Sequence, residues 1–108
     1  MTHKELHEYI MEQLAPLDEI RSIPMMGGYI YYYKERIFGG IYGSGFLVRI
    51  TEASKRAMPD SLPVKKYDSA KELMLPVTIL DDGEKFRKMV VDMYPDLPER
   101  KPKKPKKK

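Results

Sequence analysis

The chain has 108 residues, of which 42% are hydrophobic and 33% are charged, and this suits one domain with a modest core. It contains no cysteine, which excludes disulfides, thiolate nucleophiles and cysteine-ligated metals. No apolar run approaches the roughly 20 residues that cross a bilayer. Residues 1–14 lack the continuous apolar region of a secretory signal. We therefore expect a cytoplasmic protein that does not enter a membrane.

The net charge of +4 comes entirely from the last residues of the chain. Seven basic side chains and no acidic one lie in the final nine residues: Arg100, Lys101, Lys103, Lys104, Lys106, Lys107 and Lys108. The preceding 99 residues hold 13 basic and 16 acidic side chains, a net charge of −3. Since residues 99–108 have no apolar residue other than proline, we expect a folded domain over 1–98 and a disordered basic tail over 99–108. Any attraction to nucleic acid should come from that tail.

The N-terminal residues predict a helix that begins after Thr2. Thr2 and Glu5 have the spacing of a capping box, and leucine and isoleucine recur every four residues after them. Pro16 ends this helix. The segment 18–26 is then predicted as a first strand, with Pro24 favouring an edge position or a bulge.

Three further strands are predicted over residues 29–33, 37–42 and 46–50, at the spacing of an antiparallel meander. Polar or glycine-rich residues at 34–36 and 43–45 supply the turns. Side chains alternate along a strand, so Tyr29, Tyr31 and Tyr33 should share one face and Ile30 and Tyr32 the other.

The second half of the chain predicts a short helix over 52–58 capped by Thr51, and strands over 64–67 and 73–79. Asp81 and Glu84 have capping-box spacing for a last helix, whose buried face is Phe86, Met89, Val90 and Met93. These elements predict a two-layer α+β fold. Its antiparallel sheet is a meander over residues 20–50 plus a C-terminal strand, packed by the N- and C-terminal helices.

A group of residues between 17 and 50 follows a known pattern: an arginine, a glycine pair within M-x-G-G-Y, a further tyrosine, R-x-F and a closing strand. The positions are occupied, without a gap, by Arg21, Met25, Gly27, Gly28, Tyr29, Tyr32, Arg36, Phe38, Leu47 and Arg49. In this pattern the chain resembles the TfoX (Sxy) N-terminal domain family. Met26 replaces the family's phenylalanine, and Glu35 replaces the glycine of the first hairpin turn. That turn must therefore differ in geometry or carry strain.

The resemblance implies a fold similar to secretion chaperones, which often dimerise, and a role like that of competence regulators, which act with another transcription factor. We therefore expect a non-enzymatic regulatory or interaction module that forms a homodimer and binds a protein partner. The family's C-terminal helical domain has no counterpart in these residues. An alternative is a nonspecific nucleic-acid-binding protein that uses the basic tail and a tyrosine-rich sheet face. An enzyme of unrecognised type is the third hypothesis.

Candidate chemical sites are few, and each has a structural interpretation. His3 and His7 are one helical turn apart, but no third metal ligand lies nearby in sequence. The glycine-rich residues 39–45 lead into a strand and not into the helix N-terminus that a phosphate loop requires, so a hairpin turn is favoured. Ser44 lacks a nucleophile motif.

The acidic group Asp81, Asp82 and Glu84 is better explained by helix capping than by Ca²⁺ binding. The tyrosine run at 29–33 is either core or oligomer contact, or a surface on which bases stack. We expect no catalytic residue, no metal and no cofactor.

Overall fold

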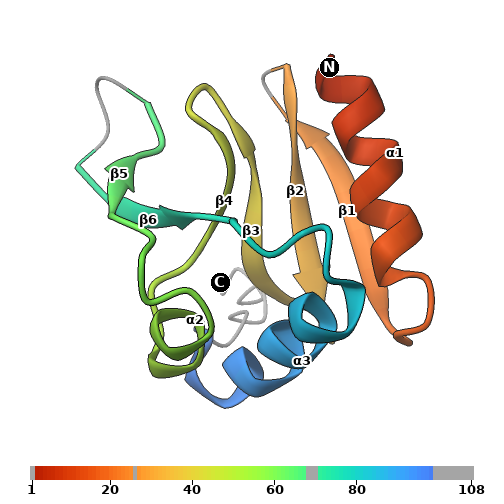
Figure 1. Cartoon of the computed structure of the whole chain (residues 1–108). Coiled ribbons are helices and arrows are strands. Elements are labelled where there is room, and N and C mark those ends of the chain that lie inside the picture. Colours follow the sequence, from red (N-terminus) through yellow and green to blue (C-terminus); the bar gives the residue numbers. More distant parts are fainter. Residues whose placement is uncertain (1, 26, 68–70, 99–108) are drawn as a thin grey trace, which may run out of the picture.

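The computed structural model describes residues 2–25, 27–67 and 71–98, and the predicted basic tail lies outside these residues. These residues form an α+β fold with three α-helices and one six-stranded antiparallel sheet. The order of the strands across the sheet is β1-β2-β3-β4-β6-β5. Figure 1 shows α1 and α3 on the same side of this sheet.

Helix α1 spans His3–Leu14 and begins as predicted. The Thr2 hydroxyl accepts a hydrogen bond from the backbone N–H of Glu5 (3.0 Å), and the Glu5 carboxylate accepts one from the backbone N–H of Thr2 (2.8 Å). Both bonds satisfy N–H groups that a helix start leaves without partners. The helix ends with Ala15 as its C-cap, immediately before Pro16.

The predicted meander is confirmed in β1 (Ile20–Met25), β2 (Gly28–Tyr33), β3 (Arg36–Tyr42) and β4 (Gly45–Val48), each antiparallel to the next. The first strand is two residues shorter at its start than predicted, and Glu19, which precedes it, has a φ of 63°. Strand β1 lies at the sheet edge, which agrees with the prediction from Pro24.

The hairpin between β2 and β3 is tighter than predicted, because Arg36 already belongs to the second strand. Only Lys34 and Glu35 form the turn, and their φ angles are 50° and 68°. Two consecutive residues with positive φ are the geometry of a type I′ turn, which normally contains glycine or asparagine. Sequence analysis left open whether Glu35 changes the geometry of this turn or strains it. The turn keeps the tight geometry and carries strain.

Strand β3 contains a bulge that the sequence did not predict. Tyr31 pairs with Gly39 and Tyr32 pairs with Ile37, so Phe38 is an extra residue opposite β2. A bulge changes the alternation of side chains. As a result Phe38 and Ile41, three residues apart, are both buried on the side of the sheet that the helices cover, while Ile37 packs on the opposite face.

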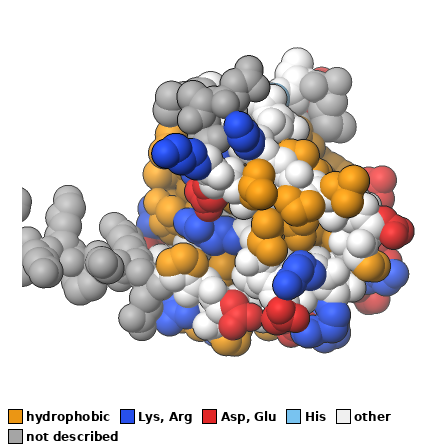
Figure 2. All heavy atoms as spheres, turned by 90° about the vertical axis from the view of Figure 1, so that its left-hand side faces the viewer, with side chains coloured by type: hydrophobic (Ala, Val, Ile, Leu, Met, Phe, Trp, Pro, Cys, Tyr) orange, Lys and Arg blue, Asp and Glu red, His pale blue; other side chains and the backbone are white. Residues whose placement is uncertain are grey.

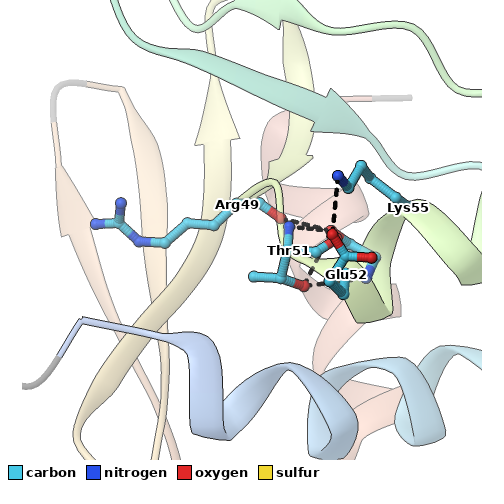
Figure 3. A network of polar contacts seen from close by, with 5 residues as sticks. Arg49, Thr51, Glu52 and Lys55 are labelled. Atoms are coloured by element: carbon cyan, nitrogen blue, oxygen red, sulfur yellow. Dashed lines mark hydrogen bonds and ion pairs between the residues drawn. The ribbon is translucent and has the colours of Figure 1, made fainter.

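Helix α2 (Glu52–Ala57) is capped by Thr51 as predicted, and a network of polar contacts fixes its start. The Ser54 hydroxyl donates to the backbone carbonyl of Arg49 (2.8 Å), and the Thr51 hydroxyl accepts from the backbone N–H of Ser54 (3.0 Å). Lys55 pairs with Glu52 at 3.1 Å on the surface. Figure 3 shows that the Arg49 side chain extends away from this network.

The C-terminal elements are shorter than predicted. Strand β5 covers only Val64–Lys65, and β6 covers Leu73–Pro76 in place of residues 73–79. Strand β6 ends at Pro76, which pairs with Leu47, and the backbone N–H of Val77 still donates to the carbonyl of Phe46 (3.1 Å).

Helix α3 spans Gly83–Met93 and continues into a 3₁₀ turn, η1 (Tyr94–Asp96). The predicted capping box at Asp81 is wrong. Asp82 is the N-cap and accepts from the backbone N–H of Lys85 (3.2 Å), while Asp81 accepts a hydrogen bond from the Tyr9 hydroxyl (2.6 Å). The start of the helix is shifted by one residue because α1 holds Asp81.

The main core lies between one face of the sheet and the helices. Its fully buried side chains include those predicted for the face of α3, together with residues of α1 and of the strands: Ile10, Leu14, Tyr31, Phe38, Ile41, Val48, Phe86, Met89, Val90 and Met93. Within the described residues, no helix is long and apolar enough to cross a bilayer.

Candidate functional site: the open face of the sheet

The opposite face of the sheet carries a second apolar cluster. In the described part of the chain, no helical residue belongs to it. We call this surface the open face. Its members come from all six strands and from Tyr67: Ile23, Ile30, Tyr32, Ile37, Tyr42, Leu47, Val64, Tyr67 and Met74. Four of these residues are buried and the other five are partly exposed. Partly exposed apolar and aromatic side chains on a face without a covering helix are typical of a binding surface.

A small pocket lies in the open face around Tyr42, and we call it the Tyr42 pocket. Its volume is about 180 Å³, and it is lined by Met25, Ile30, Tyr32, Ile37, Tyr42, Arg49, Lys66 and Tyr67. The Tyr42 ring lies over Gly40, where an added Cβ would be 3.1 Å from the ring's Cζ atom. Gly40 thus lets the ring lie flat on the sheet. The Tyr67 ring meets it edge-on, with 5.7 Å between centroids.

The hydroxyl of Tyr42 is the unusual polar group of this pocket. Only 5% of the residue is exposed, and no described residue forms a hydrogen bond with the hydroxyl. Burial raises the pKa of Tyr42 to about 12. The hydroxyl is therefore a neutral donor at physiological pH. A buried hydroxyl without a partner is costly, so this group is available to a ligand that offers an acceptor.

Two cations and one carboxylate form the rim of the pocket on the β4 side. The Glu72 carboxylate bridges Arg49 Nη1 (3.1 Å) and Lys66 Nζ (2.9 Å). Lys66 also lies over the Tyr42 ring, 5.3 Å from its centroid. Arg49 is held in place by a hydrogen bond from its Nε to the carbonyl of Ile37 (3.0 Å). Sequence analysis did not single out Lys66 or Glu72.

Arg21, one of the residues of the family pattern, contacts the pocket residue Tyr32 from strand β1. Its guanidinium stacks on the Tyr32 ring at 4.3 Å and pairs with Glu35 through two hydrogen bonds of 2.9 and 3.2 Å. These contacts fix the Tyr32 side chain at the edge of the Tyr42 pocket.

The tyrosine run at 29–33, which sequence analysis considered for base stacking, is largely covered by the helices. Tyr29, Tyr31 and Tyr33 share one face, as the alternation predicted, and this face is the one that the helices cover. Tyr31 and Tyr33 are only 0% and 7% exposed, and a buried ring cannot receive a base, so these two rings are not a stacking surface. The aromatic residues of the open face are Tyr32, Tyr42 and Tyr67, and sequence analysis did not single out Tyr67.

The other residues of the family pattern hold the fold together. Arg36 donates to the carbonyls of Tyr94 (3.0 Å) and Leu97 (3.3 Å), which ties β3 to the end of the last helix. Gly27 has a φ of 82° in the turn before β2. Gly28 lies so close to Ile41 that no Cβ fits. Met25, in contrast, is 43% exposed beside the Tyr42 pocket.

The two histidines contact different residues of the sheet side of the molecule. His3 Nδ1 contacts the carbonyl of Gly27 (3.1 Å). His7 stacks on Tyr29 with 3.8 Å between centroids, and its Nδ1 lies 2.8 Å from the hydroxyl of Tyr31. Burial raises the pKa of Tyr31 well above its usual range, so the phenol stays neutral and shares a hydrogen bond with the His7 imidazole. Both imidazoles therefore fix α1 against the start of the sheet.

We expect His7 to make stability pH-dependent. Burial lowers the pKa of His7 in the folded protein, and the Glu8 charge opposes this only in part. The unfolded chain then binds more protons than the folded protein. The contribution of His7 to the free energy of unfolding is therefore complete above pH 6.5, the ordinary pKa of histidine, and is lost as the pH falls through the lower pKa of the folded state. His7→Phe should cost about 1–2 kcal/mol at pH 7.5. It should also reduce the change in the free energy of unfolding between pH 7.5 and 5.5, measured by urea unfolding at each pH. His3→Gln is the control. An unchanged slope in His7→Phe would contradict this role.

The remaining sequence candidates have structural contacts. The Ser44 hydroxyl donates to the carbonyl of Lys65 (2.8 Å) and joins the β3–β4 turn to β5. Asp81 and Asp82 are engaged with Tyr9 and with the cap of α3, as described above, and Glu84 lies in the first turn of that helix. Residues 39–45 form the end of β3 and a hairpin turn into β4, as predicted.

Among the described residues, the hollow between α2 and α3 has no buried polar side chain in its lining. This hollow has a volume of about 350 Å³, and its charged residues Arg56, Lys85, Lys88 and Asp92 are all exposed.

Figure 2 looks onto the side that carries β5, β6 and α2 and shows hydrophobic side chains gathered there among charged ones. Leu62 and Leu73, in or next to these strands, are 75% and 48% exposed.

No protein family, no curated protein and no solved structure matches this chain. The functional argument therefore proceeds from the geometry of the open face.

Proposed function

We propose that this chain is a non-enzymatic interaction module of regulatory type, similar to the TfoX N-terminal domain, which binds a protein partner on its open face. The observation that carries the proposal is the apolar cluster on a face without a helix, because such a cluster is expected where a second molecule covers it. A fold alone does not fix a function, so the proposal depends on this surface and not on the family resemblance.

The composition of the open face supports a protein partner. Tyrosine and arginine are enriched in the centres of protein interfaces and contribute most of their binding energy. The face presents Tyr32 and Tyr67 between Arg21 and Arg49, and each arginine is already oriented by a carboxylate. Such preorganised side chains lose little entropy on binding. The homodimer and the transcription-factor partner expected from the resemblance remain predictions.

The test compares two exposed apolar residues on opposite sides of the molecule. Met25 borders the Tyr42 pocket and Val91 lies on α3, and they are 43% and 40% exposed. The tagged full chain, the double variant Met25→Glu/Tyr67→Ala and the control Val91→Glu are expressed in cells of the source organism. Partners are quantified by mass spectrometry.

The amount of partner recovered with the double variant should fall at least about tenfold. Loss of a central contact commonly costs about 2 kcal/mol of binding free energy. Val91→Glu should recover the parental amount. Circular dichroism checks that both variants are folded. Equal loss in both, or full recovery by the double variant, would show that the open face is not the binding surface.

A second candidate function is nonspecific nucleic-acid binding. The seven basic side chains of residues 100–108 favour it, because lysines release counterions from phosphate. The folded residues contribute a net charge of −3 and oppose it.

A further inference from the structure

The size of the Tyr42 pocket limits what can bind there. Small-molecule sites usually measure 300–1,000 Å³, whereas this pocket has about 180 Å³. A volume of this order accommodates one large side chain and little more. The walls are apolar or aromatic (Met25, Ile30, Ile37 and Tyr67), so the side chain that fits them is aromatic or a large aliphatic one.

The polar groups around the pocket favour a carboxylate beside that side chain. Arg49 and Lys66 converge on one carboxylate, which in this structure belongs to Glu72. The side chains of Arg49, Lys66 and Glu72 are 29%, 28% and 40% exposed. Ion pairs that are this accessible to water contribute little, so an external carboxylate can replace Glu72. The buried hydroxyl of Tyr42 adds a donor for a carbonyl or carboxylate oxygen.

A nucleic acid fits this geometry less well. Base stacking requires an open aromatic ring face. The Tyr42 ring lies flat on Gly40 and is 95% buried, and a face of the Tyr32 ring is covered by the Arg21 guanidinium. Two cations could bind phosphates, but only Tyr67 would remain for a base.

We propose that the Tyr42 pocket binds an aromatic or large aliphatic side chain of an acidic peptide segment, and that a neighbouring carboxylate of this segment takes the place of Glu72 between Arg49 and Lys66. The inference rests on the proposed function and adds the chemistry of the partner. Glu72 then acts as an internal competitor, which an acidic partner displaces.

The experiment titrates the ¹⁵N-labelled full chain with the peptide acetyl-Asp-Glu-Phe-Asp-Glu-amide at 150 mM salt and follows amide and arginine side-chain shifts. Four counter-probes are the same peptide with alanine for phenylalanine, a version with lysines for the acids, inorganic phosphate, and a five-nucleotide oligothymidine. Shifts should map to Tyr42, Arg49, Lys66 and Tyr67 with the acidic phenylalanine peptide, and each counter-probe should bind more weakly there.

Variants of the full chain test the exchange of carboxylates. Glu72→Gln should strengthen binding of the acidic peptide about two- to fivefold, because it removes the competitor. Tyr42→Phe should weaken binding about two- to tenfold, because it removes only the donor. Glu52→Gln, which changes a carboxylate paired with Lys55 on α2, should leave binding unchanged. The lysine tail is identical in all variants and cancels in the comparison.

Several results would overturn the inference. Unchanged or weaker binding by Glu72→Gln would show that Glu72 is a structural ion pair and not a competitor. Equal binding of phosphate or oligothymidine at these residues would assign the site to anions in general or to nucleic acid. Absence of shifts in the pocket would exclude acidic peptides as the occupant. The proposed function itself fails if Met25→Glu/Tyr67→Ala keeps its natural partner or if Val91→Glu loses the partner equally, so the two failures are distinguishable.

Discussion

Replacing Gly28 with alanine should destabilise the protein by about 3 kcal/mol, because the added methyl group has no room in the sheet. A Cβ at this position would overlap the carbonyl oxygen and the carbonyl carbon of Ile41 on the neighbouring strand β3. Both are backbone atoms, which move only if the β2–β3 pairing shifts. That pairing forms the middle of the meander and includes the fully buried Tyr31. The midpoint of urea unfolding, followed by circular dichroism, measures the loss.

Gly43, in the turn between β3 and β4, provides a control glycine with room for a methyl group. A Cβ there would lie 3.6 Å from Tyr67 Cδ1, an ordinary van der Waals contact. Gly43→Ala should therefore change stability by no more than about 0.5 kcal/mol. If Gly28→Ala unfolds at the same urea concentration as Gly43→Ala, the strands are not held as close together as described.

Deleting residues 100–108 should abolish binding to DNA and RNA and leave the melting temperature nearly unchanged. The deletion removes seven basic side chains and changes the net charge from +4 to −3, so the remaining domain is repelled by phosphate. For the intact chain, log affinity should fall with log salt concentration at a slope of roughly −3 to −6, since not every lysine contacts a phosphate at once. Two unrelated duplexes should bind equally, because lysines of a tail contact the backbone and not base edges.

Fluorescence anisotropy between about 50 and 200 mM salt measures these affinities. A chain with glutamine at the seven basic positions keeps the length of the tail and serves as the control. Equal binding by the truncated and the intact chain would place the nucleic-acid site on the folded domain, where Tyr67 and the cations of the open face are the first candidates. If neither form binds, nucleic acid is not a partner and only the protein-interaction proposal remains.

Local sequence patterns determined most of the secondary structure. The capping box of Thr2 and Glu5, the cap at Thr51 and the buried face of α3 depend on residues three or four positions apart, and each was predicted correctly. The alternation in β2 likewise separated Tyr31 and Tyr33 from Tyr32. Errors occurred where a distant segment intervened, as at Asp81, which hydrogen-bonds to α1 and leaves the cap to Asp82.

Which face of the sheet is covered was decided only by the tertiary structure. One face of β2 carries only tyrosines and the other carries isoleucine and tyrosine. Neither face is charged, so the sequence pattern did not indicate which face is exposed to solvent. The bulge at Phe38 also depends on how β3 pairs with β2, which no local pattern records.

For the candidate site, too, the sequence determined some features and the tertiary structure determined the others. The sequence by itself determined that this chain has a meander rich in tyrosine, a glycine pair in a constrained position and a basic end. The Tyr42 pocket required the fold, because Arg49 and Glu72 are 23 residues apart and meet only where β4 pairs with β6. Hydrophobic periodicity specifies which residues are buried, whereas the convergence of charges from distant strands follows from strand order, and strand order is a property of the whole chain.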